Sequence, residues 1–140
     1  NKCAELIKKV PDNITIKYCG RINPNEVSKI YSQYDCFLFP TQNENYGHVI
    51  AEALANQCPV ILSRGTTPWD DIDEKAGFVC KLYNDDEFTN ALSKIAAMNA
   101  KEYENLMEKT HSYYVEKTKE SEAIVGHKVM FESIIEIMNK

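Results

Sequence analysis

The stretch that decides the fold is NENYGHVIAEALANQCPVILS, residues 43–63. Its first part has helical spacing of apolar residues over 47–57, and its second part is the short apolar run PVILS, which predicts a buried strand over 59–63. Directly before it, DCFLFP predicts another strand over 35–40 that ends at Pro40. A strand, a helix and a strand at this short spacing indicate a parallel sheet.

The same alternation continues on both sides of this stretch. We expect one domain over 1–140 with an α/β, Rossmann-like fold: a parallel sheet, helices on both of its faces, and a helical C-terminus. The continuous apolar run over 35–40 predicts a strand buried on both faces. Further strands are predicted over 14–19 (ITIKYC) and 77–82 (GFVCKL), and helices over 3–10, 23–34, from about 85, 101–118 and 121–138.

Composition narrows the function classes. The chain has 140 residues, 44% of them hydrophobic and 26% charged, which is typical of a globular domain. A net charge of −5 without a basic cluster argues against nucleic acid as a partner. The 5 cysteines include no C-x-x-C pair, so we interpret them as buried free thiols in a reducing cytoplasm, with a metal site or a disulfide as the alternatives.

Three loops should leave the carboxyl edge of the sheet, where ligands bind in such folds: 20–22, 40–46 and 63–69. Glu44 precedes the helix that begins near Gly47, and Glu52 lies inside it. The free amides and the dipole of a helix start suit a phosphate, and Gly47 would allow close approach. A carboxylate on each side would suit hydroxyl groups, as in a nucleotide sugar. The alternative is that both glutamates are ordinary surface residues.

The stretch FLFPTQNENYGHVIAEALANQCPVILSRGTTPW resembles the donor-binding half of GT-B glycosyltransferases of family 4, the retaining group 1 enzymes. The matching features are Pro40-Thr41, the E-x7-E pair of Glu44 and Glu52, Tyr46-Gly47, and EALA followed by PVI. The resemblance covers about residues 14–95. It implies that the domain is the C-terminal half of a GT-B fold.

The resemblance also implies roles for individual residues. Glu52 would bind the ribose, and the backbone amides of Gly47, His48 and Val49 would bind the diphosphate. Glu44, Tyr46, Gly47 and His48 would contact the donor sugar, and the loop Gly20, Arg21 and Ile22 would contact the base. The substrate would be a UDP- or GDP-sugar, with no metal and no other cofactor. No residue of this chain is assigned a catalytic role.

This chain departs from the family pattern in two ways. Gln57 stands where the family has a glycine, and the upstream unit that carries the diphosphate-binding Arg and Lys is absent, as is the N-terminal acceptor half. Neither Arg21 nor Arg64 is assigned that diphosphate role. We therefore interpret the chain as most of a donor domain from a larger enzyme, in the cytoplasm or peripheral to the inner face of the membrane.

Several alternatives stay open. His48 either has a structural role, contacts the sugar or acts as an acid or base. Trp69 is either a hydrophobic plug, a wall of the donor pocket or a contact to the other half of the enzyme. Asp70 and Asp71 are read as helix-start residues. The chain could also be a non-catalytic GT-B-like module that binds a nucleotide or a protein. A receiver-like domain is disfavoured, because it would need clustered aspartates at strand ends.

Overall fold

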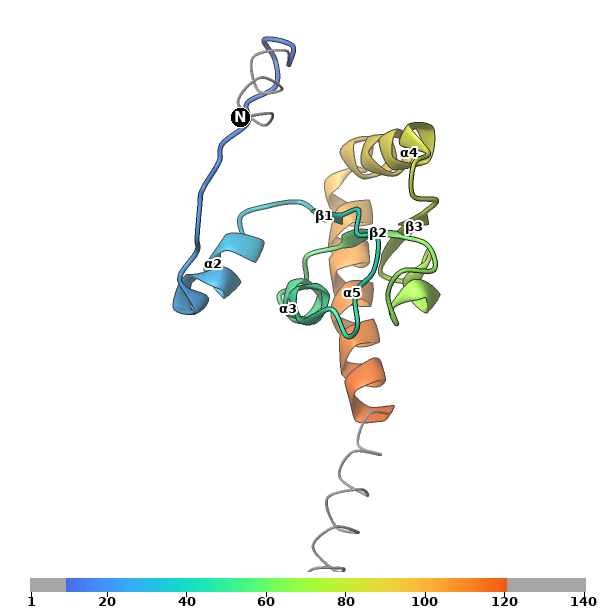
Figure 1. The fold of residues 1–140 in the computed structure, drawn as a ribbon. Helices are drawn as coiled ribbons and strands as arrows, with labels where there is room; N and C mark the ends of the chain where they lie inside the picture. The colour runs from blue at the N-terminus through green and yellow to red at the C-terminus, as the bar shows by residue number, and fades with distance from the viewer. Residues whose placement is uncertain (1–9, 121–140) are drawn as a thin grey trace, which may run out of the picture.

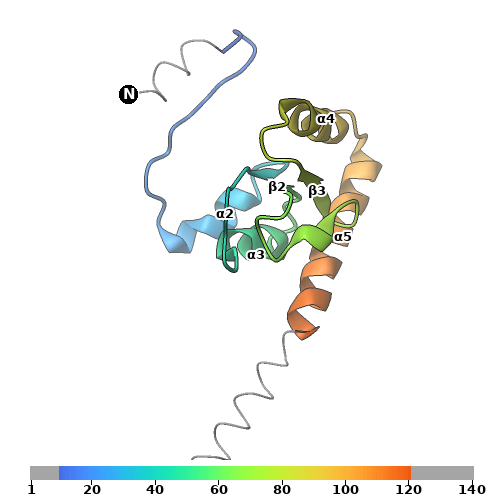
Figure 2. The same cartoon turned by 45° about the vertical axis from the view of Figure 1, so that its right-hand side comes forward.

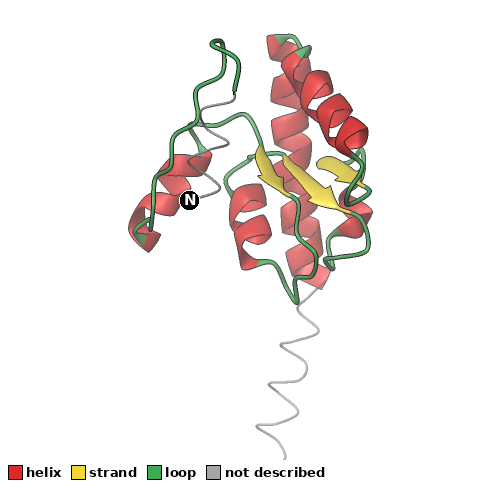
Figure 3. Cartoon of the chain, turned by 45° about the horizontal axis from the view of Figure 1, so that its top comes forward, coloured by secondary structure: helices red, strands yellow, loops and turns green. Residues whose placement is uncertain are grey.

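A computed structural model describes residues 10–120, coloured in Figure 1. The helices predicted over 3–10 and 121–138, and Cys3, lie outside this range or at its border. Three parallel strands form the sheet in the order β1 (Phe37–Phe39), β2 (Val60–Ser63) and β3 (Gly77–Cys80), drawn in yellow in Figure 3. Phe37 is paired with Val60, and Leu62 with Val79. The predicted parallel α/β sheet is confirmed.

The helices cover both faces of the sheet, as predicted. They are η1 (Pro24–Glu26), α2 (Val27–Tyr31), α3 (His48–Ala55), η2 (Asp70–Ile72), α4 (Asp85–Ala96) and α5 (Ala100–Glu120). Helix α3 lies on one side of the strands and α4 on the other (Figure 1). Over residues 10–120, none of these helices combines the length and apolar character needed to cross a bilayer.

Alternation along β2 divides the core into two parts. Val60 and Leu62 point to the α3 side, where Ile50 and Leu54 of α3 are completely buried. Ile61 points to the other side, against Ala91 and Ile95 of α4 and Leu106 of α5, whose exposed fractions are all below 10%. All four residues of β2 are buried, because this central strand is covered on both faces.

Helix α5 runs along the amino ends of the strands. The Tyr103 hydroxyl donates to the carbonyl of Asp35, which precedes β1, and the buried Thr110 hydroxyl donates to the carbonyl of Ala76, which precedes β3. Figure 2 shows α5 passing beside the sheet from the α4 end to the α3 side. The carboxyl ends of the strands, at the opposite edge, are left to the loops over 40–46 and 63–69.

The strand predicted over 14–19 is wrong. This segment is extended but pairs with no described strand, and Ile14, Ile16 and Tyr18 are 48%, 46% and 86% exposed. Figure 1 shows it running away from the sheet. Alternation and β-branching make a strand only where a neighbouring strand satisfies the backbone. The loop 20–22 therefore does not leave the sheet edge as expected.

Two further expectations need correction. The strand over 35–40 exists, but it is reduced to β1 and is not buried on both faces. Among residues 10–120, β1 is an edge strand, and Leu38 is 42% exposed. The helix over 23–34 is shorter: Asn23 caps η1 as its sequence predicts, but α2 ends at Tyr31. No residue of α2 is buried, so little packing extends it.

The cysteines are free within the described chain, but not all are buried. Cys58 and Cys80 lie in the core, Cys36 is half-buried and Cys19 is exposed. Cys19 is exposed because the predicted strand that would have buried it does not form. Burial raises the pKa of the Cys58 thiol to about 12, so it stays protonated and packs as a small apolar group.

Gln57 shows why a glycine belongs at its position. It follows the C-terminus of α3 with φ 60, in the left-handed region, while Cys58 N–H donates to Ala53 O at 2.9 Å and closes the turn. A side chain is unfavourable there by about 1 kcal/mol. We expect Gln57→Gly to raise the free energy of unfolding by about that amount in urea denaturation. Gln57→Ala keeps a Cβ and should give no gain; equal gains in both variants would refute this account.

Candidate functional site

Helix α3 begins at a glycine that no other residue could replace without strain. Gly47 is buried with φ 76 and ψ 55, and a Cβ there would lie 2.7 Å from Ile50 Cδ1 and 3.3 Å from Trp69 Nε1. The left-handed turn starts the helix sharply and leaves the first amides pointing outward. The predicted helix start at Gly47 is confirmed.

The amides at this helix start differ in availability. Gly47 N–H donates to Glu44 Oε1 at 3.3 Å, while Ile50 and Ala51 N–H donate to the Gly47 carbonyl. Within residues 10–120, the amides of His48 and Val49 have no hydrogen-bond partner. Together with the helix dipole, these two amides can donate hydrogen bonds to one anion.

The loop that carries Glu44 is hydrogen-bonded to the neighbouring loop at the sheet edge. Its N–H donates to the Thr66 carbonyl at 2.8 Å, which joins the loop after β1 to the loop after β2. Its half-buried carboxylate then lies at the start of α3 through the bond from Gly47. The structure therefore places Glu44 beside the proposed diphosphate position, as the sequence predicts, but the carboxylate already accepts one backbone hydrogen bond.

A pocket of about 300 Å³ lies between α2 and α3 and brings three predicted residues together. Ile22, Val49 and Glu52 all line it, so the base loop and the ribose residue face one cavity. The other lining residues are Val27, Ile30, Tyr31, Tyr34, Cys36 and Phe37. The walls are apolar and aromatic apart from the Glu52 carboxylate. Such a pocket suits a flat ring system that carries hydroxyl groups on one side.

Tyr31 fixes the position of this pocket relative to the helix start. Its hydroxyl donates to the Val49 carbonyl at 3.0 Å. Burial, together with the negative charge of Glu52, raises the pKa of Tyr31 to about 12, so the hydroxyl remains a donor. The sequence gave no signal for this bond, which depends on how α2 meets α3.

A second pocket of about 520 Å³ lies on the other side of α3. It is lined by Tyr46, His48, Ala51, Glu52, Ala55, Asn56 and Tyr114. The Tyr46 and His48 rings are 4.8 Å apart and tilted by 50°. Glu52 lines both pockets, whereas Glu44 lines neither. The residues predicted for the donor sugar are thus divided, with Tyr46 and His48 here and Glu44 bound to Gly47.

Gly20 and Arg21 contribute less than the sequence predicts. Both are exposed, neither lines the two pockets beside α3, and no heavy atom lies within 4 Å of a Cβ built at Gly20. Of the base loop, only Ile22 reaches the pocket with Glu52. The difference follows from the strand over 14–19, because a loop is held at a sheet edge only when the strand before it is paired.

The structure also shows the surroundings of four further residues near this edge that the sequence analysis singled out. Arg64, which sequence left unassigned, donates to Asp73 at 3.1 Å and to the Val79 carbonyl at 2.9 Å, so its charge is already paired. Trp69 is 2% exposed, which confirms the interpretation as a hydrophobic plug. Asp70 and Asp71 open η2, which confirms them as helix-start residues.

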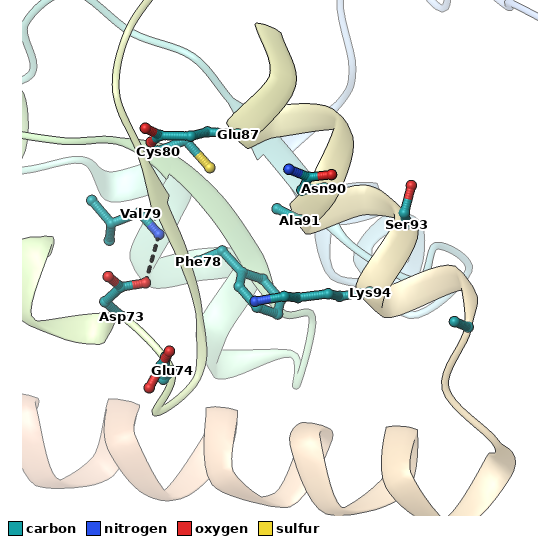
Figure 4. Close-up of a pocket in the computed structure, with 11 residues that line it drawn as sticks. Asp73, Glu74, Phe78, Val79, Cys80, Glu87, Asn90, Ala91, Ser93 and Lys94 are labelled. Atoms are coloured by element: carbon teal, nitrogen blue, oxygen red, sulfur yellow. Dashed lines mark hydrogen bonds between the residues drawn. The ribbon is translucent and has the colours of Figure 1, made fainter. Parts of the chain in front are cut away.

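A cavity of about 580 Å³ outside β3 has a different character, shown in Figure 4. Three of its acidic residues, Asp73, Glu74 and Glu87, are hydrogen-bonded to the backbone of β3 or of the residue that follows it. Asp73 accepts from Val79 N–H at 3.0 Å, Glu87 accepts from Lys81 N–H at 2.7 Å, and Glu74 N–H donates to the Gly77 carbonyl. These bonds close the free edge of β3, so we read this cavity as a protected sheet edge.

Comparison with known proteins identifies a matching family and two similar proteins. The family model for glycosyl transferases group 1 matches residues 1–113. The chain is 26% identical over 98 residues to a sulfoquinovosyl transferase of Arabidopsis thaliana, which aligns 67% of this chain with 19% of that protein. It is 30% identical over 89 residues to a processive diacylglycerol alpha-glucosyltransferase of Acholeplasma laidlawii, covering 64% of this chain and 26% of that protein.

The fold is also found among solved structures. A sucrose-phosphate synthase from Thermosynechococcus elongatus superposes with a TM-score of 0.64 and 20% identity, over 90% of this chain and 34% of that one. This likeness concerns the fold. The chain spans about a fifth to a quarter of the length of the two curated relatives.

Proposed function

Because the chain belongs to the family of glycosyl transferases group 1, we propose that it is the nucleotide-sugar-binding domain of a retaining glycosyltransferase. Its substrate would be a UDP- or GDP-sugar, and no metal or other cofactor would be required. The acceptor would be a glycan or a lipid-linked molecule, bound by an N-terminal half of the intact enzyme. Transfer would then occur between the two halves, with this domain holding the donor.

One observation carries this proposal: the pocket with Ile22, Val49 and Glu52 opens beside the free amides at the start of α3. Val49 belongs to both features, because it lines the pocket and its amide belongs to the helix start. A nucleoside in the pocket would therefore have its phosphates next to the helix dipole. Glu52 would accept hydrogen bonds from the ribose hydroxyls.

The donor sugar would extend past the helix start toward Tyr46 and His48. An exposed aromatic ring and an imidazole 4.8 Å apart offer a stacking surface and a polar contact for a hydroxyl-rich ring. Glu44 would contact the sugar once the diphosphate occupies the helix start. The developing charge on the leaving diphosphate would be stabilised by the helix dipole and by basic side chains of the intact enzyme that lie outside residues 10–120.

The unpaired edge of the sheet at β1 supports the proposal that this domain is part of a larger enzyme. β1 is an edge strand with its middle residue 42% exposed, and we propose that upstream strands of the intact protein pair with it. One curated relative is named for a diacylglycerol acceptor, which supports a lipid-linked acceptor for this protein as well. We accordingly propose a cytoplasmic enzyme that works at the inner face of the membrane.

Glu52→Ala tests the nucleoside assignment. We expect it to weaken binding of the preferred nucleotide by about 1–3 kcal/mol, because the ribose hydroxyls lose their charged acceptor. The measurement is calorimetry, or NMR if affinity is millimolar, with UDP, GDP, ADP and their common sugar conjugates. Unchanged binding in this variant would refute the ribose assignment.

Glu44→Gln is the matched comparison, since it removes one charge near the same helix but keeps an acceptor for Gly47 N–H. It should leave the free nucleotide unaffected and weaken only the sugar-bearing form. If both ligands lose affinity equally, Glu44 does not contact the sugar. Absence of binding of every nucleotide to the intact protein would favour a non-catalytic module.

A further inference from the structure

Trp69 lies directly beneath the turn that begins α3. Its Nε1–H donates to the Tyr46 carbonyl at 2.5 Å, and the two rings meet edge to face with centroids 5.9 Å apart. The Tyr46 carbonyl and the Gly47 N–H belong to one peptide group. Trp69 holds one end of this peptide and Glu44 the other, through the bond from Gly47 N–H at 3.3 Å. The orientation of the peptide is therefore fixed from both sides.

This peptide group determines where the next two amides point. At a helix start, the first N–H groups follow the direction set by the N-cap residue before them, and here that residue, Gly47, is held at φ 76 and ψ 55. The packing is close: Trp69 Nε1 would lie 3.3 Å from a Cβ at Gly47. A rotation of the peptide would redirect the amides of His48 and Val49, which the proposed function assigns to the diphosphate.

Trp69 is itself held from the other side by α5. Its ring lies 6.3 Å from the Tyr113 ring, and Asp71, two residues later, accepts from the Tyr113 hydroxyl and from Lys117, each at 2.8 Å. Burial opposes the charge of Asp71, but the bonds from Lys117 and Tyr113 outweigh it and hold the pKa of this carboxyl below its usual value. The loop carrying Trp69 is thus anchored to α5.

We propose that Trp69 is a positioning residue for the diphosphate, acting through the Tyr46–Gly47 peptide, with α5 as its support. This inference rests on the proposed function, since it concerns the same helix start. It goes further in assigning a role to a buried tryptophan that touches neither pocket beside α3. It predicts that the effect of Trp69 on binding is confined to ligands that carry phosphates.

Trp69→Phe is the test, because it keeps an aromatic ring and removes the Nε1–H together with the five-membered ring that carries it. In the intact protein we expect affinity for UDP to fall about fivefold, the value of one hydrogen bond. Affinity for uridine should change by less than about twofold, since the nucleoside pocket does not contact Trp69. If the wild type selects guanine, GDP and guanosine replace this pair. A variant that was merely less stable would not separate the two ligands.

Tyr83→Phe is the matched control. Tyr83 follows β3 at the same sheet edge and its hydroxyl bonds Gln42 at 2.9 Å, so the change also removes one hydrogen bond, but away from the Tyr46–Gly47 peptide. It should leave both affinities unchanged. If wild type binds UDP and Trp69→Phe binds it equally well, or loses uridine to the same extent, the positioning role is overturned. If wild type binds neither ligand, the proposed function itself fails.

Discussion

Gly77→Ala should destabilise the domain by about 3–5 kcal/mol, a large fraction of the stability of an ordinary domain. Gly77 begins β3 and is the register partner of Val60 in the central strand. A Cβ at Gly77 would lie 2.1 Å from the Val60 carbonyl oxygen and 3.1 Å from its carbonyl carbon. These are backbone atoms of the central strand, so they cannot move away without breaking the β2–β3 ladder.

The measurement is urea denaturation followed by far-UV circular dichroism, and we expect a much lower midpoint or a chain already unfolded in buffer. Gly65→Ala is the comparison, because no heavy atom lies within 4 Å of a Cβ there. It should cost about 1–2 kcal/mol, from its left-handed backbone alone. A Gly77→Ala protein as stable as Gly65→Ala would contradict the close approach of the strands.

Gly47→Ala should have the second largest effect, and it should act on both stability and binding. We expect a loss of about 2–4 kcal/mol in the free energy of unfolding, from left-handed strain at φ 76 together with overlap at Ile50 and Trp69. The surviving folded protein should bind nucleoside diphosphates more weakly, because relief of the overlap must shift the helix start. Denaturation and calorimetry measure the two effects on the same sample.

Gly65→Ala is the closer control for this variant. Its φ of 72 nearly equals that of Gly47, but its surroundings are open, so it isolates backbone strain from overlap. The excess destabilisation of Gly47→Ala over Gly65→Ala then measures the packing of Ile50 and Trp69 around the turn. If the two variants are equally stable and bind nucleotide equally, the turn does not control the site.

The fold was predictable where the pattern is strong and the elements pack on one another. The run PVILS and the helix before it show their structure through local periodicity, and both are buried in the core. ITIKYC carries an equally good strand pattern, yet it pairs with nothing among residues 10–120. A strand needs a neighbour, and no local property of a sequence reports whether the neighbour is present.

The candidate site, like the fold, could be predicted only in part from the sequence. The helix start at Gly47 and the two glutamates beside it could be identified from residue types and spacing. The bonds that hold them could not: Trp69 reaches the Tyr46 carbonyl across 23 residues, and Tyr31 reaches Val49 across 18. These contacts depend on how loops and helices from different units meet. Sequence therefore indicated which residues could bind a ligand, whereas the structure shows what fixes their geometry.

The strands lie in space in the order in which the chain contains them, and this bears on synthesis. A ribosome releases β1 before β2 and β2 before β3, so each new strand can join the edge formed by the one before it. The outer backbone of β3 is bonded by Arg64, Asp73 and Glu74, which all lie between β2 and β3 in the chain. We therefore expect this sheet to grow in one direction during translation, and its last strand, β3, to have its outer edge bonded by residues that the ribosome has already released.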